Sequence, residues 1–227
     1  MKKTCIVSFF MPNIHPVTVE MQAKVVEKYN VSKIPHLRVQ CPMPTVDNNG
    51  EAVDRFVQMN ESDSRLGYEN IIVLDIDCIP LSEKTLDYIA QKSSDGYLIG
   101  NIQRSNHIMN NEHVFVAPSL IAFNMDIYRK MGSPSFRETP RGDMSEELTY
   151  RAEEQNIPIE MIMPLRYDAA PREAPFWPLA KGMPNYGIGT TYGNDEFGEM
   201  SWHCFQIRYP GNQQRFFDKC NEVLGVK

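Results

Sequence analysis

The sequence has few cysteines and no paired cysteine motif. Its five cysteines are odd in number, widely spread and never arranged as C-x-x-C: Cys5, Cys41, Cys78, Cys204 and Cys220. A disulfide framework or a structural zinc knuckle needs a regular cysteine pattern, so both classes are disfavoured. The cysteine usage predicts a cytoplasmic protein. The compact size and the expected lack of a membrane anchor are compatible with an enzyme of a bacterium or of the cytosol of a virus-infected host.

Long apolar runs are also missing. No stretch approaches the roughly 18 apolar residues that a membrane-spanning helix needs. The run Cys5–Met11 follows two lysines, as in a secretory signal, but Pro12 and Asn13 end it early and no small-residue cleavage site follows. We therefore expect a buried strand at 4–11 and no membrane span.

The chain lacks an excess of basic charge. Its 23 Lys and Arg against 29 Asp and Glu give a net charge of −6, which argues against a dedicated duplex-DNA binder with a basic face. Hydrophobic residues make up 42% of the 227 residues, enough to bury a core and to argue against wholesale disorder. Without repeats or a linker, 1–227 is predicted to be a single domain.

Strand and helix patterns alternate along the chain, which predicts an α/β fold. The expected architecture is a three-layer α/β/α sandwich with a mostly parallel central sheet. Strands are predicted at 4–11, 36–40, 70–80, 96–101, 114–124 and 157–163, and helices at 17–29, 52–59, 82–90, 125–131 and 143–156. The segment 171–200 is rich in proline, glycine and aromatics and is predicted to be irregular.

Two acids end the most apolar of these strands. Asp75 and Asp77 are two residues apart, so in an extended strand both side chains point to the same face. Carboxylates held that closely repel unless they share a proton or bind a cation. A hard divalent cation such as Mg²⁺ or Mn²⁺, held by these acids and by ligand phosphates, fits the pattern.

The segment Asn70–Pro80 resembles the Asp-x-Asp strand end of nucleotide-sugar-dependent glycosyltransferases of the A-type fold. The resemblance implies a metal-dependent hexosyl- or pentosyltransferase that transfers a sugar from a nucleotide-sugar donor to an acceptor hydroxyl. The donor would bind a Rossmann-like half at about 1–100, and the acceptor, a glycan, a small molecule or a modified nucleic-acid base, a catalytic half at about 101–227. In this family Asp77, helped by Asp75, would hold Mn²⁺ or Mg²⁺ on the donor diphosphate.

The same resemblance implies further residues of the nucleotide site. The first strand and the loop after it, with Phe10 and Met11, would line the nucleotide pocket, and Arg65 would contact the nucleotide. Arg208 and Lys181 lie in the part of the chain expected to neutralise the diphosphate, although both residue types are commonly solvated surface charges. The segment Asn185–Asn194 is interpreted as a hinged cover that closes over the bound donor.

Acids of a charged helix are the candidates for the catalytic base. The helix resembles the one that follows the family's catalytic acid, but the usual position of the base holds Ser145 here. Asp143, Glu146 or Glu147 could replace it and would give inversion at the sugar carbon. The alternative is structural, because Asp143 and Glu146 have the spacing of a capping box.

His203 is the third metal-ligand candidate. It follows the segment rich in glycine and proline, where metal-dependent branches of this family place a histidine that completes the metal shell. An imidazole ligand would favour Mn²⁺ over Mg²⁺. A single histidine among aromatics is more often a packing residue, and that interpretation stays open.

Two other functions compete with glycosyl transfer. A phosphohydrolase of the haloacid-dehalogenase type would use Asp75 and Asp77 on its nucleophile strand. That family normally has Gly-Thr after the second acid, whereas Cys78 and Ile79 follow Asp77 here. The other alternative is a catalytically inactive protein that binds a sugar nucleotide.

Overall fold

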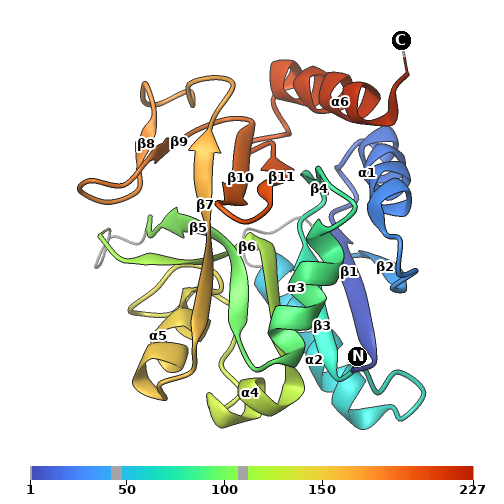
Figure 1. The fold of residues 1–227 in the computed structure, drawn as a ribbon, viewed down its shortest axis with the longest axis vertical. Helices are drawn as coiled ribbons and strands as arrows, with labels where there is room; N and C mark the ends of the chain where they lie inside the picture. Colours follow the sequence, from blue (N-terminus) through green and yellow to red (C-terminus); the bar gives the residue numbers. More distant parts are fainter. Residues whose placement is uncertain (1, 42–47, 107–111, 227) are drawn as a thin grey trace.

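The computed structural model describes residues 2–41, 48–106 and 112–226 (Figure 1). Among these, no helix combines the length and the apolar character needed to cross a bilayer. The strands are β1 Thr4–Phe10, β2 His36–Gln40, β3 Asn70–Leu74, β4 Cys78–Pro80, β5 Leu98–Arg104, β6 Val114–Asn124, β7 Ile159–Arg166, β8 Trp177–Pro178, β9 Asn185–Tyr186, β10 Thr190–Asn194 and β11 Gly198–His203. The helices are α1 Pro16–Tyr29, α2 Asn48–Ser62, α3 Thr85–Ser94, α4 Met125–Lys130, α5 Glu146–Glu154 and α6 Pro210–Leu224.

The central sheet is mixed, so the prediction of a mostly parallel sheet is wrong. Its order is β2-β1-β3-β6-β5-β7-β10-β11-β4. Parallel pairing is limited to β1 with β2 and β3, and to β5 with β7. The other pairs are antiparallel. One cause is local: the three residues between β10 and β11 allow only an antiparallel hairpin.

Helices cover both faces of the sheet, as the burial of successive residues along β1 requires. Cys5 and Val7 pack in one core with residues of α2, α4 and α5. Ile6 points to the opposite face and packs with residues of α1 and α3. A third cluster joins α1 and α6 over β4 and β11, where Trp202 is fully buried. Figure 1 shows α1 and α6 side by side at this end of the sheet.

The sheet curls back on itself at the link between β3 and β4. These strands stand six places apart in the sheet order, which in a flat sheet would be roughly 29 Å. Only three residues join them, and the path from Leu74 to Cys78 spans at most roughly 14 Å. The β4 end of the sheet must therefore return to β3. The run 70–80, predicted to be one strand, is thus two strands joined by a turn.

The segment 171–200 is more regular than predicted. Thr190–Asn194 forms the buried strand β10 between β7 and β11, so the second half of the predicted cover 185–194 is part of the sheet and not a hinged cover. Gly193 lies at a bulge, where a Cβ atom would clash with the carbonyl oxygen of Gly198. This glycine therefore serves the close approach of two strands instead of a hinge.

Candidate metal centre

The turn at residues 75–77 is fixed by its backbone. The Asp75 amide donates to the carbonyl of Ser119 on β6 (3.0 Å), and the Cys78 amide donates to the Asp75 carbonyl (2.9 Å). On the other side, the Cys204 amide donates to the Asp77 carbonyl (2.9 Å). The two acids therefore lie where the β4 end of the curled sheet returns to β3 and β6, and both sides of this junction bind the turn.

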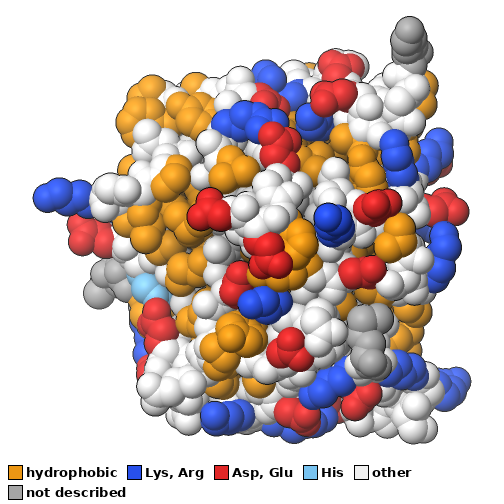
Figure 2. Space-filling model, in the orientation of Figure 1, with side chains coloured by type: hydrophobic (Ala, Val, Ile, Leu, Met, Phe, Trp, Pro, Cys, Tyr) orange, Lys and Arg blue, Asp and Glu red, His pale blue; other side chains and the backbone are white. Residues whose placement is uncertain are grey.

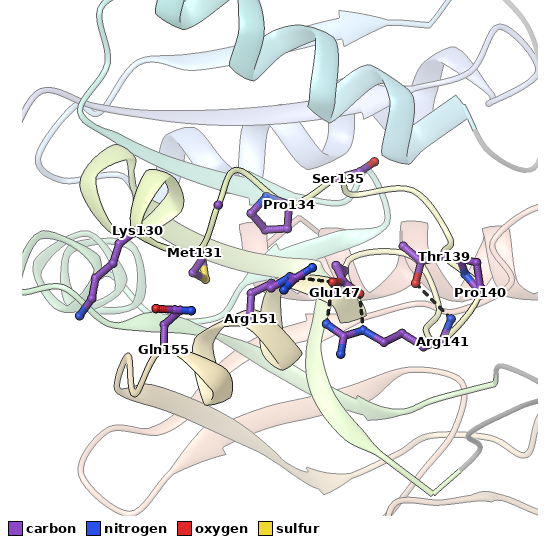
Figure 3. A pocket seen from close by; sticks show the side chains of 11 residues that line it. Lys130, Met131, Pro134, Ser135, Thr139, Pro140, Arg141, Glu147, Arg151 and Gln155 are labelled. Atoms are coloured by element: carbon purple, nitrogen blue, oxygen red, sulfur yellow. Dashed lines mark hydrogen bonds and ion pairs between the residues drawn. The ribbon is translucent and has the colours of Figure 1, made fainter.

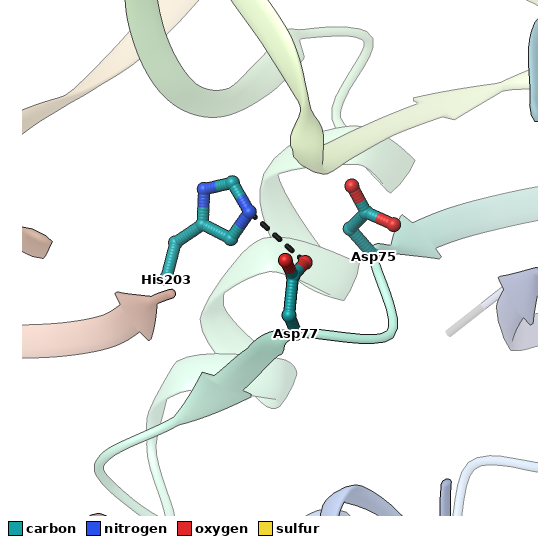
Figure 4. Close-up of side chains that lie close together, drawn as sticks. All are labelled: Asp75, Asp77 and His203. Carbon is teal, nitrogen blue, oxygen red and sulfur yellow. Dashed lines mark hydrogen bonds and ion pairs between the residues drawn. The ribbon is translucent and has the colours of Figure 1, made fainter. Parts of the chain in front are cut away.

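The turn brings the two acids together with His203 at the end of β11 (Figure 4). One ligand atom from each of Asp75, Asp77 and His203 lies within 4.8 Å of the others. His203 Nε2 is 3.1 Å from Asp77 Oδ1, and both side chains are buried. The register of β11 on β4, which pairs His203 with Cys78, produces this approach. Two hard carboxylates and an imidazole form a donor set that could hold a divalent metal ion.

The electrostatics of the group favour a cation. Burial, and next the charge of Asp77, raise the pKa of Asp75 to about 7, against the opposing effects of His203 and Arg208. A carboxyl group with such a pKa retains part of its proton at neutral pH. A bound cation would replace that proton and remove the repulsion between the carboxylates. This response to burial supports the fit of a metal to these residues.

A cavity of about 440 Å³ opens over the acids. It collects five of the residues predicted for the nucleotide site: Phe10, Met11, Asp75, Asp77 and Arg208. Arg208 follows β11, and its guanidinium lies 3.4 Å from the Met11 sulfur. The cavity is thus acidic at its base and has an arginine in its wall.

Other lining residues were missed by the sequence-based reasoning. Ile14, Gln206 and Tyr209 line the same cavity, and Val53 lines a small apolar recess beside Asp75. Gln206 and Tyr209 could have been predicted, because they lie close in the chain to His203 and Arg208. No local pattern marks Val53, which reaches the site from α2.

Arg65 and Lys181 are not brought to this cavity. Arg65 precedes β3, and its carbonyl accepts from Lys3 just before β1. Arg65 therefore lies at the N-terminal ends of these strands, whereas Asp75 follows the C-terminal end of β3. Its side chain is 88% exposed and binds Asp63. Lys181 is exposed in the loop between β8 and β9, outside the described lining. The nucleotide-binding assignment of both residues therefore has no support in the geometry.

Glu146 has a structural environment. It is fully buried at the start of α5 and accepts from the Ser105 hydroxyl (2.7 Å) and the Asp143 amide (2.6 Å). His113 Nδ1 lies 2.6 Å from its other oxygen. Burial raises the pKa of Glu146, but the hydrogen bonds from His113 and Ser105 lower it by more, so the net shift of this pKa is downward. The bond to Asp143 is one half of the predicted capping box, although the helix begins later, at Glu146.

Glu147 faces a different cavity, of about 690 Å³ (Figure 3). Arg141 binds both of its oxygens, at 2.8 and 2.7 Å, and Arg151 approaches to 2.9 Å. Hydrogen bonds from Arg141 are the first cause of a lowered pKa for Glu147. Figure 3 shows both guanidinium groups directed at this carboxylate. A carboxylate held in this way is committed to ion pairs.

Asp143 is the least restrained of the three acids. It is half-buried, and one oxygen accepts from the Met144 amide (2.7 Å). Its neighbour Met144 lines the recess next to Asp75. The segment that carries Asp143 therefore borders the site. Ser145 is buried, adopts a left-handed conformation (φ 66°) and donates to the Val116 carbonyl.

Comparisons with known proteins show the fold. No protein-family model and no curated protein matches the chain. The catalytic domain of Drosophila β1,4-galactosyltransferase 7, in complex with xylobiose, matches at a TM-score of 0.50 and 12% identity over 71% of this chain. The chain spans 65% of the length of that domain. The resemblance to the A-type glycosyltransferase fold is thereby confirmed at the level of the fold.

Two further structures are similar at lower scores. A mannosyltransferase from Pyrobaculum calidifontis, in complex with GDP-Man and Mn²⁺, has a TM-score of 0.47 and 13% identity, covering 70% of this chain and 54% of its own. A glycosyltransferase involved in glycosylation of the major capsid of PBCV-1 has a TM-score of 0.45 and 12% identity, covering 70% and 79%.

Proposed function

We propose that this protein is a metal-dependent glycosyltransferase that transfers a sugar from a nucleotide-sugar donor to an acceptor hydroxyl. The observation that carries the proposal is the cavity whose base holds Asp75 and Asp77 and whose wall holds Arg208. Carboxylates at the base of an open cavity suit a cation that also binds ligand phosphates. The fold, similar to that of a galactosyltransferase catalytic domain, supports the same function.

Asp75, Asp77 and His203 would hold the metal ion. The imidazole favours Mn²⁺ over Mg²⁺, because Mg²⁺ prefers an all-oxygen shell. When bound, the ion supplies positive charge to the diphosphate leaving group. Arg208 adds a second cationic group on the same cavity, and the apolar side chains of Phe10 and Met11 offer a surface for the nucleoside.

Asp143 is the proposed base, because Glu146 and Glu147 are engaged in buried hydrogen bonds and ion pairs. The acceptor oxygen attacks the anomeric carbon while the bond to the diphosphate oxygen breaks, and the acceptor proton passes to the Asp143 carboxylate. Attack opposite the leaving group inverts the anomeric configuration. The acceptor is a glycan, a small molecule or a modified nucleic-acid base.

The charge distribution leaves these acceptor classes open. On the face shown in Figure 2, acidic and basic side chains are interspersed. The net charge of −6 is therefore not gathered in a single patch of that face. A basic groove for a nucleic acid would have to lie elsewhere on the molecule.

The experiment is a nucleoside-diphosphate release assay with a panel of nucleotide sugars, with Mn²⁺ or with chelator. We expect metal-dependent release, from slow donor hydrolysis or from transfer to an added acceptor. Asp143→Asn should reduce release at least 100-fold at an unchanged melting temperature, in line with the typical worth of a general base. Glu147→Gln is the matched control, which should affect melting but not turnover.

Two outcomes would replace the proposal. Release of inorganic phosphate from phosphomonoesters without any nucleoside diphosphate would indicate a phosphohydrolase that uses Asp75 and Asp77. Metal-dependent binding of a nucleotide sugar without turnover on any acceptor would indicate a binding protein.

A further inference from the structure

Gln22 contacts the turn that carries Asp75 and Asp77. It projects from α1 and is fully buried. Its side-chain Nε2 donates to the carbonyl of Asp75 (2.6 Å) and to the carbonyl of Cys78 (3.1 Å). Because a carbonyl oxygen can only accept, these two partners fix the orientation of the amide. Its Oε1 has no hydrogen-bond partner among the described residues, so the NH₂ group makes the polar contacts of this side chain.

Gln22 adds a second donor to the Asp75 carbonyl, which also accepts from the Cys78 amide. At this point the chain leaves β3 and enters β4, which belongs to the far end of the curled sheet. Ladder hydrogen bonds are therefore interrupted between the two strands, and buried carbonyls require other partners. Gln22 binds the carbonyls that bracket the two acids, one at Asp75 and one just after Asp77.

We infer that Gln22 is a positioning residue for the metal centre. This inference rests on the proposed function, since it assumes that the acids bind a cation. By holding both ends of the three-residue link, the Gln22 amide sets the separation of the two carboxylates. A helix packed on the core thereby determines the ligand geometry without contacting the ion. Partners of this kind orient ligands, and their loss typically lowers metal affinity about 10- to 100-fold.

The same helix offers a matched control. Thr18 lies one turn before Gln22 on the same face of α1 and is also fully buried. Its hydroxyl has no hydrogen-bond partner within the described chain. Thr18→Val therefore removes a buried polar group beside Gln22 and leaves both carbonyl contacts in place.

The experiment measures Mn²⁺ affinity directly, by the loss of the electron paramagnetic resonance signal of free Mn²⁺ on titration with the 227-residue protein. Gln22→Met keeps the length of the side chain and removes its donors. We expect its dissociation constant to rise about 10- to 100-fold, and that of Thr18→Val to stay within about two-fold of the wild-type value. Melting temperatures are recorded for each variant.

Three results contradict the inference. If Gln22→Met binds Mn²⁺ as tightly as the wild type, Gln22 is only a packing residue and the proposed function stands. If Thr18→Val weakens binding equally, the effect belongs to the helix and not to the amide. If the wild type binds no Mn²⁺, the inference and the metal-dependent function both fail. Should Gln22→Met not fold, Gln22→Asn, whose amide is one methylene too short to reach both carbonyls, carries the same expectation.

Discussion

Replacing Asp77 with asparagine should stabilise the metal-free protein. With the carboxylates of Asp75 and Asp77 within 4.8 Å, their repulsion is about 3 kcal/mol at an effective dielectric constant near 20. The substitution removes this repulsion and weakens the hydrogen bond with His203 by about 1 kcal/mol. The net gain of about 2 kcal/mol corresponds to roughly 4–8 °C in melting temperature for a chain of this size. It applies near pH 8, because the pKa of Asp75 is about 7.

Saturating Mn²⁺ should make the wild type more stable than Asp77→Asn. At 100 times its dissociation constant, a ligand stabilises the native state by about 2.7 kcal/mol, which is roughly 5–10 °C here. The wild type should gain this increment, and Asp77→Asn should not. The assay is thermal unfolding at pH 8 in chelator and in Mn²⁺, with Asp126→Asn as a control on an exposed acid. The reasoning is refuted if Asp77→Asn is less stable in chelator and gains as much from Mn²⁺ as the wild type.

Three further predictions concern residues around the site. Arg208→Leu should weaken binding of a nucleoside diphosphate by roughly 10- to 150-fold, which corresponds to the loss of a hydrogen bond to a charged group. Arg65→Leu, the control, should leave the dissociation constant unchanged. If calorimetry shows that both variants weaken binding equally, the assignment of the nucleotide to this cavity is contradicted. Glu147→Gln should lower the free energy of unfolding by about 1 kcal/mol, because it removes the charge that Arg141 and Arg151 bind at the surface; an unchanged urea midpoint would contradict this. Burial lowers the pKa of His113, but Glu146 raises it more, and the pKa of Glu146 is lowered. The stabilisation that the His113–Glu146 pair provides is therefore complete between about pH 4.5 and 6.5 and is lost on either side. In urea unfolding, the difference in free energy of unfolding between wild type and His113→Gln should be largest in this range. A difference that does not vary with pH would refute the pairing.

The parallel half of the fold could be predicted because its signals are local. The buried run at 4–10 and the helix after it form β1 and α1 close to the expected bounds. The break at residues 75–77 could not be predicted, since both flanking strands are buried and the run looks continuous. The partner of β4 is β11, more than a hundred residues later in the chain, and no short-range pattern encodes that pairing.

Part of the candidate site could also be predicted from the sequence. Asp75, Asp77 and His203 come together as expected, although through a turn and not through an extended strand. The structure does not bring Arg65 to the cavity. The sequence does not show at which end of the strands a loop residue lies, and the Arg65 side chain binds Asp63. The contact of Gln22 with the turn could not be recognised in the sequence, because its partners are backbone carbonyls.

The most direct test of the metal centre is an anomalous difference map at the manganese absorption edge, from crystals grown with Mn²⁺ and a nucleoside diphosphate. We predict one strong peak between the carboxylates of Asp75 and Asp77 and His203 Nε2, in contact with the diphosphate in the cavity beside Arg208. A nucleotide bound in that cavity without such a peak, or a peak at another site, would contradict it.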